Sequence, residues 1–134
     1  MGFLRPHAER IYALLRIMTG FMFLHHGLQK LFGLFGGTPP GAPPFIIYGA
    51  GAIEFVGGAL VLLGLFAGPA AFICSGTMAV AFFIGHVAPA GGNILPIVNK
   101  GELAALYCFV FLYIAAHGSG IWSVDAARGA SKRS

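Results

Sequence analysis

Four apolar stretches, each near the length of a membrane-spanning helix, make up most of the sequence. They cover about residues 11–35, 45–66, 69–87 and 102–117. A helix needs about 20 mostly apolar residues to cross the hydrocarbon core of a bilayer. Only 9% of the 134 residues are charged and the mean hydropathy is +0.84, which leaves too little polar surface for a soluble domain. The pattern predicts an integral membrane protein.

The connections between these stretches are short and rich in helix breakers. The segment 36–44 reads GGTPPGAPP, the turn at 67–69 reads AGP, and several glycines and prolines lie in 88–101. Short connections favour antiparallel neighbouring helices. We therefore predict an all-α membrane protein with one domain over residues 1–134, an antiparallel four-helix bundle followed by a tail at 122–134. The first stretch lacks a small-residue cleavage pattern, so we interpret it as a retained helix.

The distribution of basic residues predicts the orientation in the membrane. Two arginines precede the first apolar stretch and three basic residues follow the last, whereas the loop 33–44 carries no charge. Basic residues are enriched on the cytoplasmic side of membrane proteins, so both termini are expected to be cytoplasmic and the protein to lie in the inner membrane. This asymmetry explains the net charge of +4, which therefore does not indicate a nucleic-acid partner.

Polar residues and glycines share one face of the first helix. At about 100° per residue, the residues on an arc of roughly 120° are Arg16, Gly20, Phe23, His26, Gly27 and Lys30. His25 points almost the opposite way and is expected to be a hydrogen-bonded packing residue. Because glycines let a neighbouring helix approach closely, this face is predicted to look into the bundle.

The predicted topology brings further ionisable residues to the same depth, in the outer half of the membrane. Ionisable groups inside membranes are rare and mark binding sites or proton paths, so this convergence is the main functional prediction. The candidate ligand-binding or proton-exchanging residues are His26, Lys30, Glu54, His86 and Glu102. Four of them have a simpler interpretation: Lys30 can snorkel or form a structural ion pair with Glu54, His86 can be interfacial, and Glu102 can complete a helix cap after Asn99.

A smaller polar group is predicted at the inner end. Trp122 is typical of an interfacial anchor, and Asp125 is placed to pair with Arg16 or Arg10 and hold the tail against the helices. We expect a structural role for Arg16, Trp122 and Asp125. Cys74 and Cys108 form no CxxC motif and are expected to be packing residues.

No spacing motif indicates a resident metal or haem. His26 and His86 lie at comparable depth, but their spacing does not favour axial haem ligation, and the acidic and histidine residues form no metal-binding pattern. We therefore assign no metal and no bound cofactor. A quinone that diffuses in the membrane is the candidate ligand.

Several segments in order resemble one family. RIMTGFMFLHHGLQK, GAIEFVGGALVLLGLF, NKGELAALY and GSGIWSVD are similar to segments of the DoxX family. This resemblance implies a four-helix membrane protein associated with oxidoreductase systems, some of them quinone-reducing. It also implies packing roles for four glycines and family-like polar positions at six further residues. The glycines are Gly20, Gly27, Gly58 and Gly64, and the polar positions are Arg16, Lys30, Glu54, Glu102, Trp122 and Asp125.

Three functions remain open at this point. The first is a membrane subunit of a redox system that contributes a quinone-interacting polar pocket and works with other membrane or redox subunits. The second is an accessory subunit of a larger respiratory or photosynthetic complex, without chemistry of its own. The third is a proton-coupled carrier of a small lipophilic solute, in which Glu54 takes up the proton.

Overall fold

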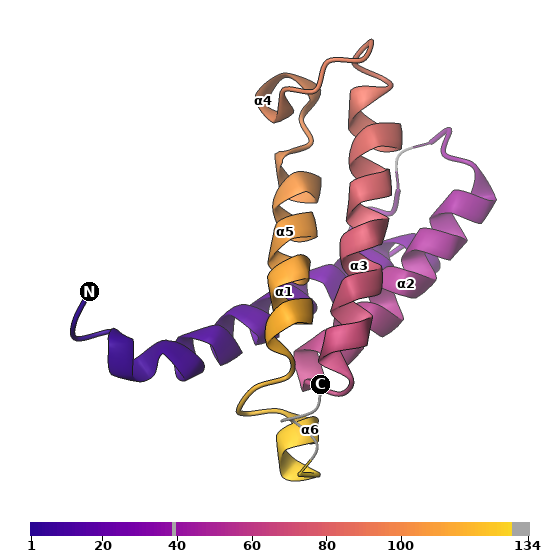
Figure 1. Ribbon diagram of the computed structural model, residues 1–134. Helices are drawn as coiled ribbons and strands as arrows, with labels where there is room; N and C mark the ends of the chain where they lie inside the picture. Colours follow the sequence, from indigo (N-terminus) through magenta and orange to yellow (C-terminus); the bar gives the residue numbers. More distant parts are fainter. Residues whose placement is uncertain (39, 130–134) are drawn as a thin grey trace.

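The computed structural model describes residues 1–38 and 40–129, and within them it contains helices and no strand. Four long helices follow one another along the chain, with short helical segments before the first, at the end of the third, and around the fourth (Figure 1). Their bounds are η1 Arg5–His7, α1 Ala8–Phe32, α2 Pro44–Leu63, α3 Ala67–Phe82, η2 Phe83–Val87, α4 Pro96–Asn99, α5 Glu102–His117 and α6 Val124–Ala127. The predicted helices are present with boundaries shifted by a few residues, and residues 130–134 of the predicted tail lie outside the described residues.

Three helical segments have the length and composition of membrane spans. They are Arg5–Phe32, Pro44–Leu63 and the continuous α3–η2 segment Ala67–Val87. The apolar α5 has 16 residues and is shorter. At 1.5 Å per residue it extends about 24 Å, less than the ~30 Å hydrocarbon core. The structure thus supports an integral membrane protein with three clear candidate spans.

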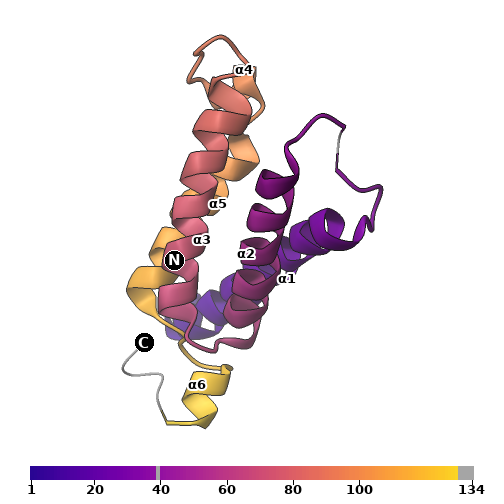
Figure 2. The ribbon, with the colours of Figure 1, turned by 90° about the vertical axis from the view of Figure 1, so that its right-hand side faces the viewer.

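The long helices form two hairpins. α1 packs against α2, α3 packs against α5, and the contact between α2 and α3 joins the pairs, whereas α1 touches α5 only locally. Figure 1 shows α1 running obliquely across α3 and α5, with its N-terminal half projecting away from them. Figure 2 shows α3 beside α5 and α2 beside α1. The arrangement is therefore more open than the predicted four-helix bundle.

Glycines explain why the α1–α2 hairpin is so tight. A Cβ atom placed on Gly20 would lie 2.7 Å from the Gly58 carbonyl oxygen, and one on Gly58 would lie 2.6 Å from the Leu24 nitrogen. A Cβ on Gly27 would lie 2.7 Å from the Phe55 Cα atom. Because these neighbours are backbone atoms, only glycine permits this spacing. This places the polar face of α1 firmly beside α2.

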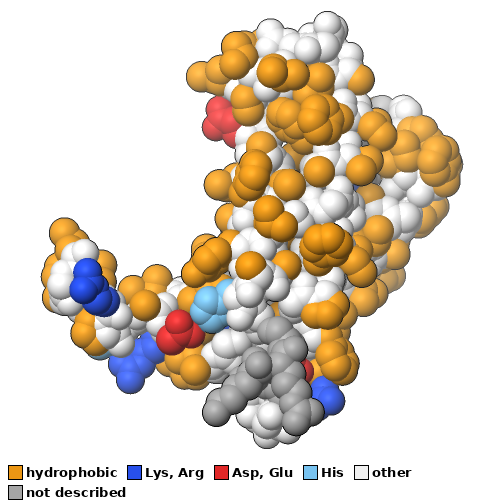
Figure 3. Space-filling model, viewed as in Figure 1, with side chains coloured by type: hydrophobic (Ala, Val, Ile, Leu, Met, Phe, Trp, Pro, Cys, Tyr) orange, Lys and Arg blue, Asp and Glu red, His pale blue; other side chains and the backbone are white. Residues whose placement is uncertain are grey.

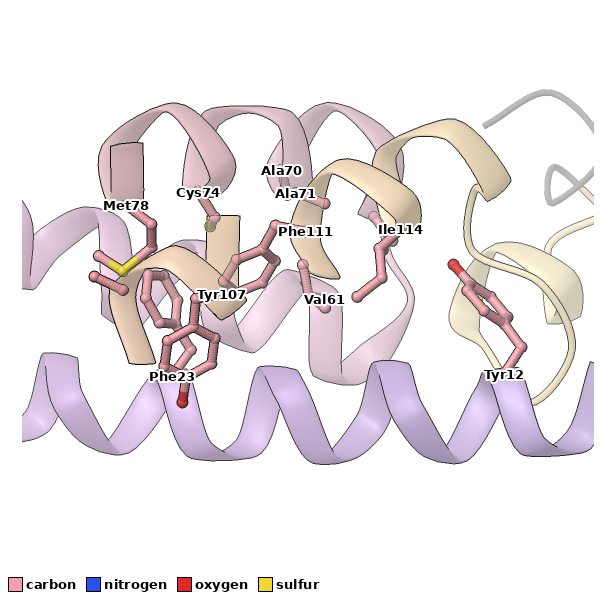
Figure 4. Close-up of a cluster of buried hydrophobic side chains, with 12 residues drawn as sticks. Tyr12, Phe23, Val61, Ala70, Ala71, Cys74, Met78, Tyr107, Phe111 and Ile114 are labelled. Atoms are coloured by element: carbon pink, nitrogen blue, oxygen red, sulfur yellow. The ribbon is translucent and has the colours of Figure 1, made fainter. Parts of the chain in front are cut away.

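The core lies between the two hairpins. Phe23 of α1, Val61 of α2, Cys74 of α3 and Phe111 of α5 are buried in one cluster (Figure 4). The periphery is apolar: Figure 3 shows hydrophobic side chains over most of the visible face. A large exposed apolar surface of this kind is what a chain surrounded by lipid tails requires.

The two ends of the molecule differ in character. The connections 33–43 and 88–101 lie at one end, which we call the loop end, whereas the turn between α2 and α3 and the short helix α6 lie at the other, the tail end (Figures 1 and 2). A separate polar cluster occupies each end. These two clusters correspond to the outer and inner groups expected from the sequence.

Candidate functional site

A pocket of about 250 Å³ opens at the loop end between the two hairpins. α1 and α2 contribute one side, and α3, η2, α5 and the connection before α5 contribute the other. Its lining residues are Phe23, His26, Lys30, Glu54, Met78, His86, Lys100, Leu103, Ala104 and Tyr107. The structure thus brings together four of the five residues predicted for this cluster, and the fifth, Glu102, does not line the pocket.

The Lys30–Glu54 ion pair joins α1 to α2 inside this pocket. The Lys30 ammonium nitrogen lies 2.9 Å from Oε1 and 2.7 Å from Oε2 of Glu54. Glu54 is 3% exposed, whereas the Lys30 side chain, which also lines the pocket, is 24% exposed. Gly51, which lies one turn before Glu54, packs against the Lys30 side chain, where an added Cβ would lie 3.0 Å from the Lys30 Cβ. The pair is a buried, charge-assisted contact with one partner still accessible.

Aromatic rings form the apolar wall of the pocket. Tyr107 of α5 is 5% exposed, and its ring centroid lies 5.2 Å from that of Phe23 and 5.6 Å from that of Phe111. The His26 ring stands perpendicular to the Tyr107 ring at 6.1 Å. In Figure 4 the Tyr107 ring extends from α5 toward α1 with its hydroxyl at the α1 end. That buried hydroxyl has no hydrogen-bond partner among the described residues.

His86 and the connection 88–101 form the mouth of the pocket. His86 lies in the π-helical turn η2, and its Nδ1 is 3.2 Å from the Asn99 carbonyl oxygen. The Asn99 side chain donates to the Asn93 carbonyl at 2.9 Å and accepts from the Gly101 N–H at 2.8 Å. These bonds fold the connection back onto α3. π-Helical turns are rare and often accompany functional sites.

Lys100 follows at the mouth in a backbone conformation unusual for its residue type. Its φ of +64° falls in the left-handed region, which side chains other than glycine seldom adopt. Lys100 lines the pocket, is exposed, and forms no ion pair with any residue that the structure describes. The hydrogen bonds of the neighbouring Asn99 hold this turn in place.

Glu102 is exposed and begins α5 away from the pocket. The Gly101 N–H donates to the side-chain oxygen of Asn99, so the Glu102 carboxylate is not its acceptor. The Glu102 carboxylate still lies in the first helical turn, where the helix dipole favours a negative charge. Its position in the first turn agrees with the expected interaction with the helix dipole, but α5 has no side-chain cap, so the predicted cap by Glu102 is not formed.

Arg16 organises the tail end and does not snorkel. It is fully buried, and its guanidinium donates to four backbone carbonyls. Nε donates to Val61 at 3.1 Å, Nη1 to Ser119 and to Ile121 at 3.0 Å, and Nη2 to Trp122 at 2.7 Å. The planar fork of arginine thus ties α1 to the end of α2 and to the segment after α5.

Asp125 completes the tail-end cluster. Its Oδ2 accepts from the Phe66 N–H at 2.8 Å and from the Ser119 hydroxyl at 2.7 Å, and its own N–H donates to the Gly64 carbonyl at 3.0 Å. The segment after α5 therefore links Asp125 to Arg16, while Trp122 is 55% exposed, as expected of an interfacial side chain. These contacts support a structural role for the inner group.

His25 lies apart from the main pocket. Its Nδ1 is 2.7 Å from the Phe21 carbonyl, and its ring contacts the rings of Phe21 and Phe35. It lines a shallow groove of about 300 Å³ together with Met22, His26, Gln29 and Phe35. The hydrogen bond and the ring contacts agree with the expectation that His25 is a hydrogen-bonded packing residue.

Two polar residues of the pocket, Tyr107 and Lys100, are not among those predicted from the sequence. Tyr107 had a detectable signal, because the buried positions of α5 are Ala104, Tyr107, Phe111 and Ile114, which recur with helical spacing. Tyr107 is the polar member of that buried stripe. No sequence pattern indicates Lys100, because its position depends on how the connection 88–101 folds.

Two relatives resemble the chain over most of its length. An "Uncharacterized protein" of Haemophilus influenzae is 41% identical over 129 residues, which cover 93% of this chain and 96% of that protein. The "Putative oxidoreductase CatD" of Bacillus subtilis is 31% identical over 118 residues, which cover 84% of this chain and 82% of that protein. No solved structure matches. The DoxX family model matches residues 11–87, which include most of α1 and all of α2 and α3, with Arg16, Lys30 and Glu54, and the chain belongs to the DoxX family.

Proposed function

We propose that the protein is a membrane subunit of a redox system and that its loop-end pocket binds the head group of a quinone. The observation that carries this proposal is the Lys30–Glu54 ion pair, buried inside an aromatic-walled pocket between two helical hairpins. Ionisable groups in membrane-embedded positions are costly and usually serve binding or proton transfer. Arg16 supplies the contrast, because the hydrogen bonds that the structure describes for its guanidinium group go to backbone carbonyls.

The size of the pocket suits one substituted ring. An apolar cavity of about 150 Å³ accommodates benzene, and this pocket measures about 250 Å³. The space therefore matches a quinone head group, with any long isoprenoid tail outside in the lipid. Phe23, Tyr107 and Met78 provide the apolar and aromatic contacts that such a ring requires.

The polar residues of the pocket can exchange the protons that the reduction of a quinone requires. Reduction of a quinone to a quinol consumes two electrons and two protons. In this proposal Glu54 and His26 exchange the protons, and Lys30 stabilises the charged form of Glu54 between transfers. The electrons come from a redox-active partner subunit, which is the part of the proposal that requires other proteins.

The relatives add support of a general kind. A protein that is 31% identical carries the name "Putative oxidoreductase CatD". That similarity covers 84% of this chain, and the family model separately includes both Lys30 and Glu54. A redox role is thus the function toward which the site chemistry and the comparison both point.

Two glutamates provide a matched experiment. Glu54 lies in the pocket, whereas Glu102 is exposed at the same end and outside it. Glu54→Gln is expected to lower quinone-dependent electron transfer in membranes at least tenfold, and Glu102→Gln to leave it within twofold. Equal amounts of correctly inserted protein are confirmed by immunoblot. Unchanged electron transfer in a well-inserted Glu54→Gln variant would refute the proposal and favour an accessory subunit without chemistry.

A further inference from the structure

The loop-end pocket holds one polar group and one charge that no described residue satisfies. The Tyr107 hydroxyl is buried without a hydrogen-bond partner among the described residues, and it belongs to a residue that lines the pocket. Buried hydroxyl groups are almost always hydrogen-bonded, by protein or by something bound. A ligand oxygen in the pocket would supply the missing acceptor.

The charges that line the pocket do not balance. Among the described residues that line the pocket, Glu54 supplies the only carboxylate, and both of its oxygens lie within 2.9 Å of the Lys30 ammonium group. Lys100 remains as a second cation at the mouth, and Glu102, the acidic residue nearest to it in the sequence, does not line the pocket. Lys30, Glu54 and Lys100 together therefore give the pocket one excess positive charge.

The backbone holds Lys100 at the mouth despite an unfavourable conformation. Its φ of +64° is stabilised by the surrounding turn, where Asn99 bonds to Asn93 and Gly101 and His86 contacts the Asn99 carbonyl. Non-glycine residues in left-handed conformations persist where the surrounding structure imposes them, and they cluster at binding sites. The fold thus fixes a positive charge beside an apolar pocket.

From these three features we propose that the pocket selects the ionised form of a hydroxylated ring compound. Tyr107 donates a hydrogen bond to one ring oxygen, and Lys100 faces the ionised oxygen at the mouth. The ring packs against Phe23 and Tyr107. This assignment rests on the proposed quinone pocket and adds to it a ligand class, an anionic ring with at least two oxygens, and two recognition residues.

Two probe molecules of similar size distinguish the effect of ligand charge on binding from the effect of ligand shape. One is a methylnaphthoquinone that carries a ring hydroxyl and is ionised at neutral pH, and the other is dimethylnaphthoquinone, which is neutral. Their dissociation constants are measured by titration of the purified full-length protein in lipid nanodiscs. The wild-type protein is expected to bind the ionised probe at least tenfold more tightly than the neutral one.

The variants assign this preference to residues. Lys100→Gln is expected to weaken binding of the ionised probe about tenfold and to leave the neutral probe unchanged, because it removes only the charge. Tyr107→Phe is expected to weaken both probes at least fivefold, because it removes only the hydroxyl. The controls are Tyr113→Phe, an exposed tyrosine of the same helix, and Arg10→Gln, an exposed basic residue of α1, and neither is expected to change binding.

The outcomes distinguish this inference from the proposed function. Equal affinity of the wild-type protein for both probes, or unchanged binding by Tyr107→Phe, would overturn the inference and leave the quinone pocket standing. Failure of the wild-type protein to bind either probe would overturn both. The comparison of probes in the wild-type protein needs no variant, so it remains decisive if a variant folds poorly.

Discussion

Arg16 and Lys30 lie on the same side of α1, one toward each end of the molecule, and they bind different kinds of acceptor. Arg16 donates to the backbone carbonyls of four residues and is fully buried. Lys30 contacts a carboxylate and remains partly accessible from the pocket. A buried cation held by several backbone carbonyls has a structural role, whereas one paired at the edge of a pocket is available to a ligand.

Removal of Lys30 tests how far the ion pair also stabilises the fold. Lys30→Met leaves the Glu54 carboxylate buried without its cation, and we expect this to destabilise the protein by about 3 kcal/mol, since breaking one side of a buried pair leaves an uncompensated charge. The double variant Lys30→Met/Glu54→Gln is expected to recover most of this loss. Denaturant titration in detergent measures both. A single variant as stable as the wild type would contradict the buried-pair description.

Arg16→Lys is expected to be strongly destabilising although it preserves the charge. A lysine ammonium group cannot reproduce the planar fork that reaches Val61, Ser119 and Trp122 together. We expect a loss of about 2–3 kcal/mol, comparable to one or two charge-assisted hydrogen bonds. Limited proteolysis should then cut the segment after α5 more readily. The exposed Arg10→Lys serves as the control, and equal sensitivity of the two variants would argue against the clamp.

At the scale of helices, glycine positions decide which faces meet. Gly20, Gly27 and Gly58 allow α1 and α2 to approach closely, and this contact fixes the partners Lys30 and Glu54 side by side. The sequence contains enough information to predict this face, because helical periodicity and the small size of glycine are local properties. The pocket follows from it as soon as the second hairpin packs alongside.

Two glycines of α2 give a matched test of this contact. Gly58→Ala places a Cβ against the backbone of α1, and we expect it to cost about 1–3 kcal/mol, typical of overpacking. Gly49→Ala is on the same helix, but its Cβ meets nothing within 4 Å. It is expected to be neutral or to stabilise by up to about 1 kcal/mol, because alanine favours helix. Thermal unfolding in detergent compares them. Tolerance of both changes would show that α1 and α2 are not held this closely.

Prediction from sequence failed where a position depends on the folding of a connection. Glu102 was grouped with the pocket because it starts a helix at the right end, but the Asn99 turn directs it to the outside. Lys100 was not predicted to line the pocket, because only the fold of the same turn places it there. Tyr107 was overlooked because a tyrosine in an apolar helix looks like core packing until its unpartnered hydroxyl is seen. The oblique path of α1 depends on contacts between hairpins, which a local pattern does not encode.

For the whole molecule, the two polar ends define a direction across the membrane. The short helix α6 lies at the tail end, and the connection between α1 and α2, which carries no charge, lies at the loop end (Figure 1). From the positive-inside rule we propose that the tail end faces the cytoplasm and that the protein lies in the inner membrane. The pocket would then lie in the outer half of the bilayer, within reach of quinones and of membrane partners.

Cysteine labelling tests this orientation. In a background with Cys74→Ala and Cys108→Ala, the exposed positions Ala42 and Ala127 are replaced singly by cysteine. A membrane-impermeant maleimide should label Ala42→Cys in intact spheroplasts, but Ala127→Cys only after permeabilisation. The permeabilised sample of each variant is the control for reactivity. The reverse pattern would place the pocket on the cytoplasmic side.

The location of a bound quinone tests the central claim most directly. The measurement is a crystal structure of the purified protein with a brominated short-chain quinone, in which the anomalous signal of bromine locates the ring. We expect the bromine peak in the loop-end pocket, between His26, Glu54 and Tyr107. A peak in the apolar groove between α2 and α3, lined by Ala52, Leu60 and Ile73, or no bound quinone at saturating concentration, would contradict the account.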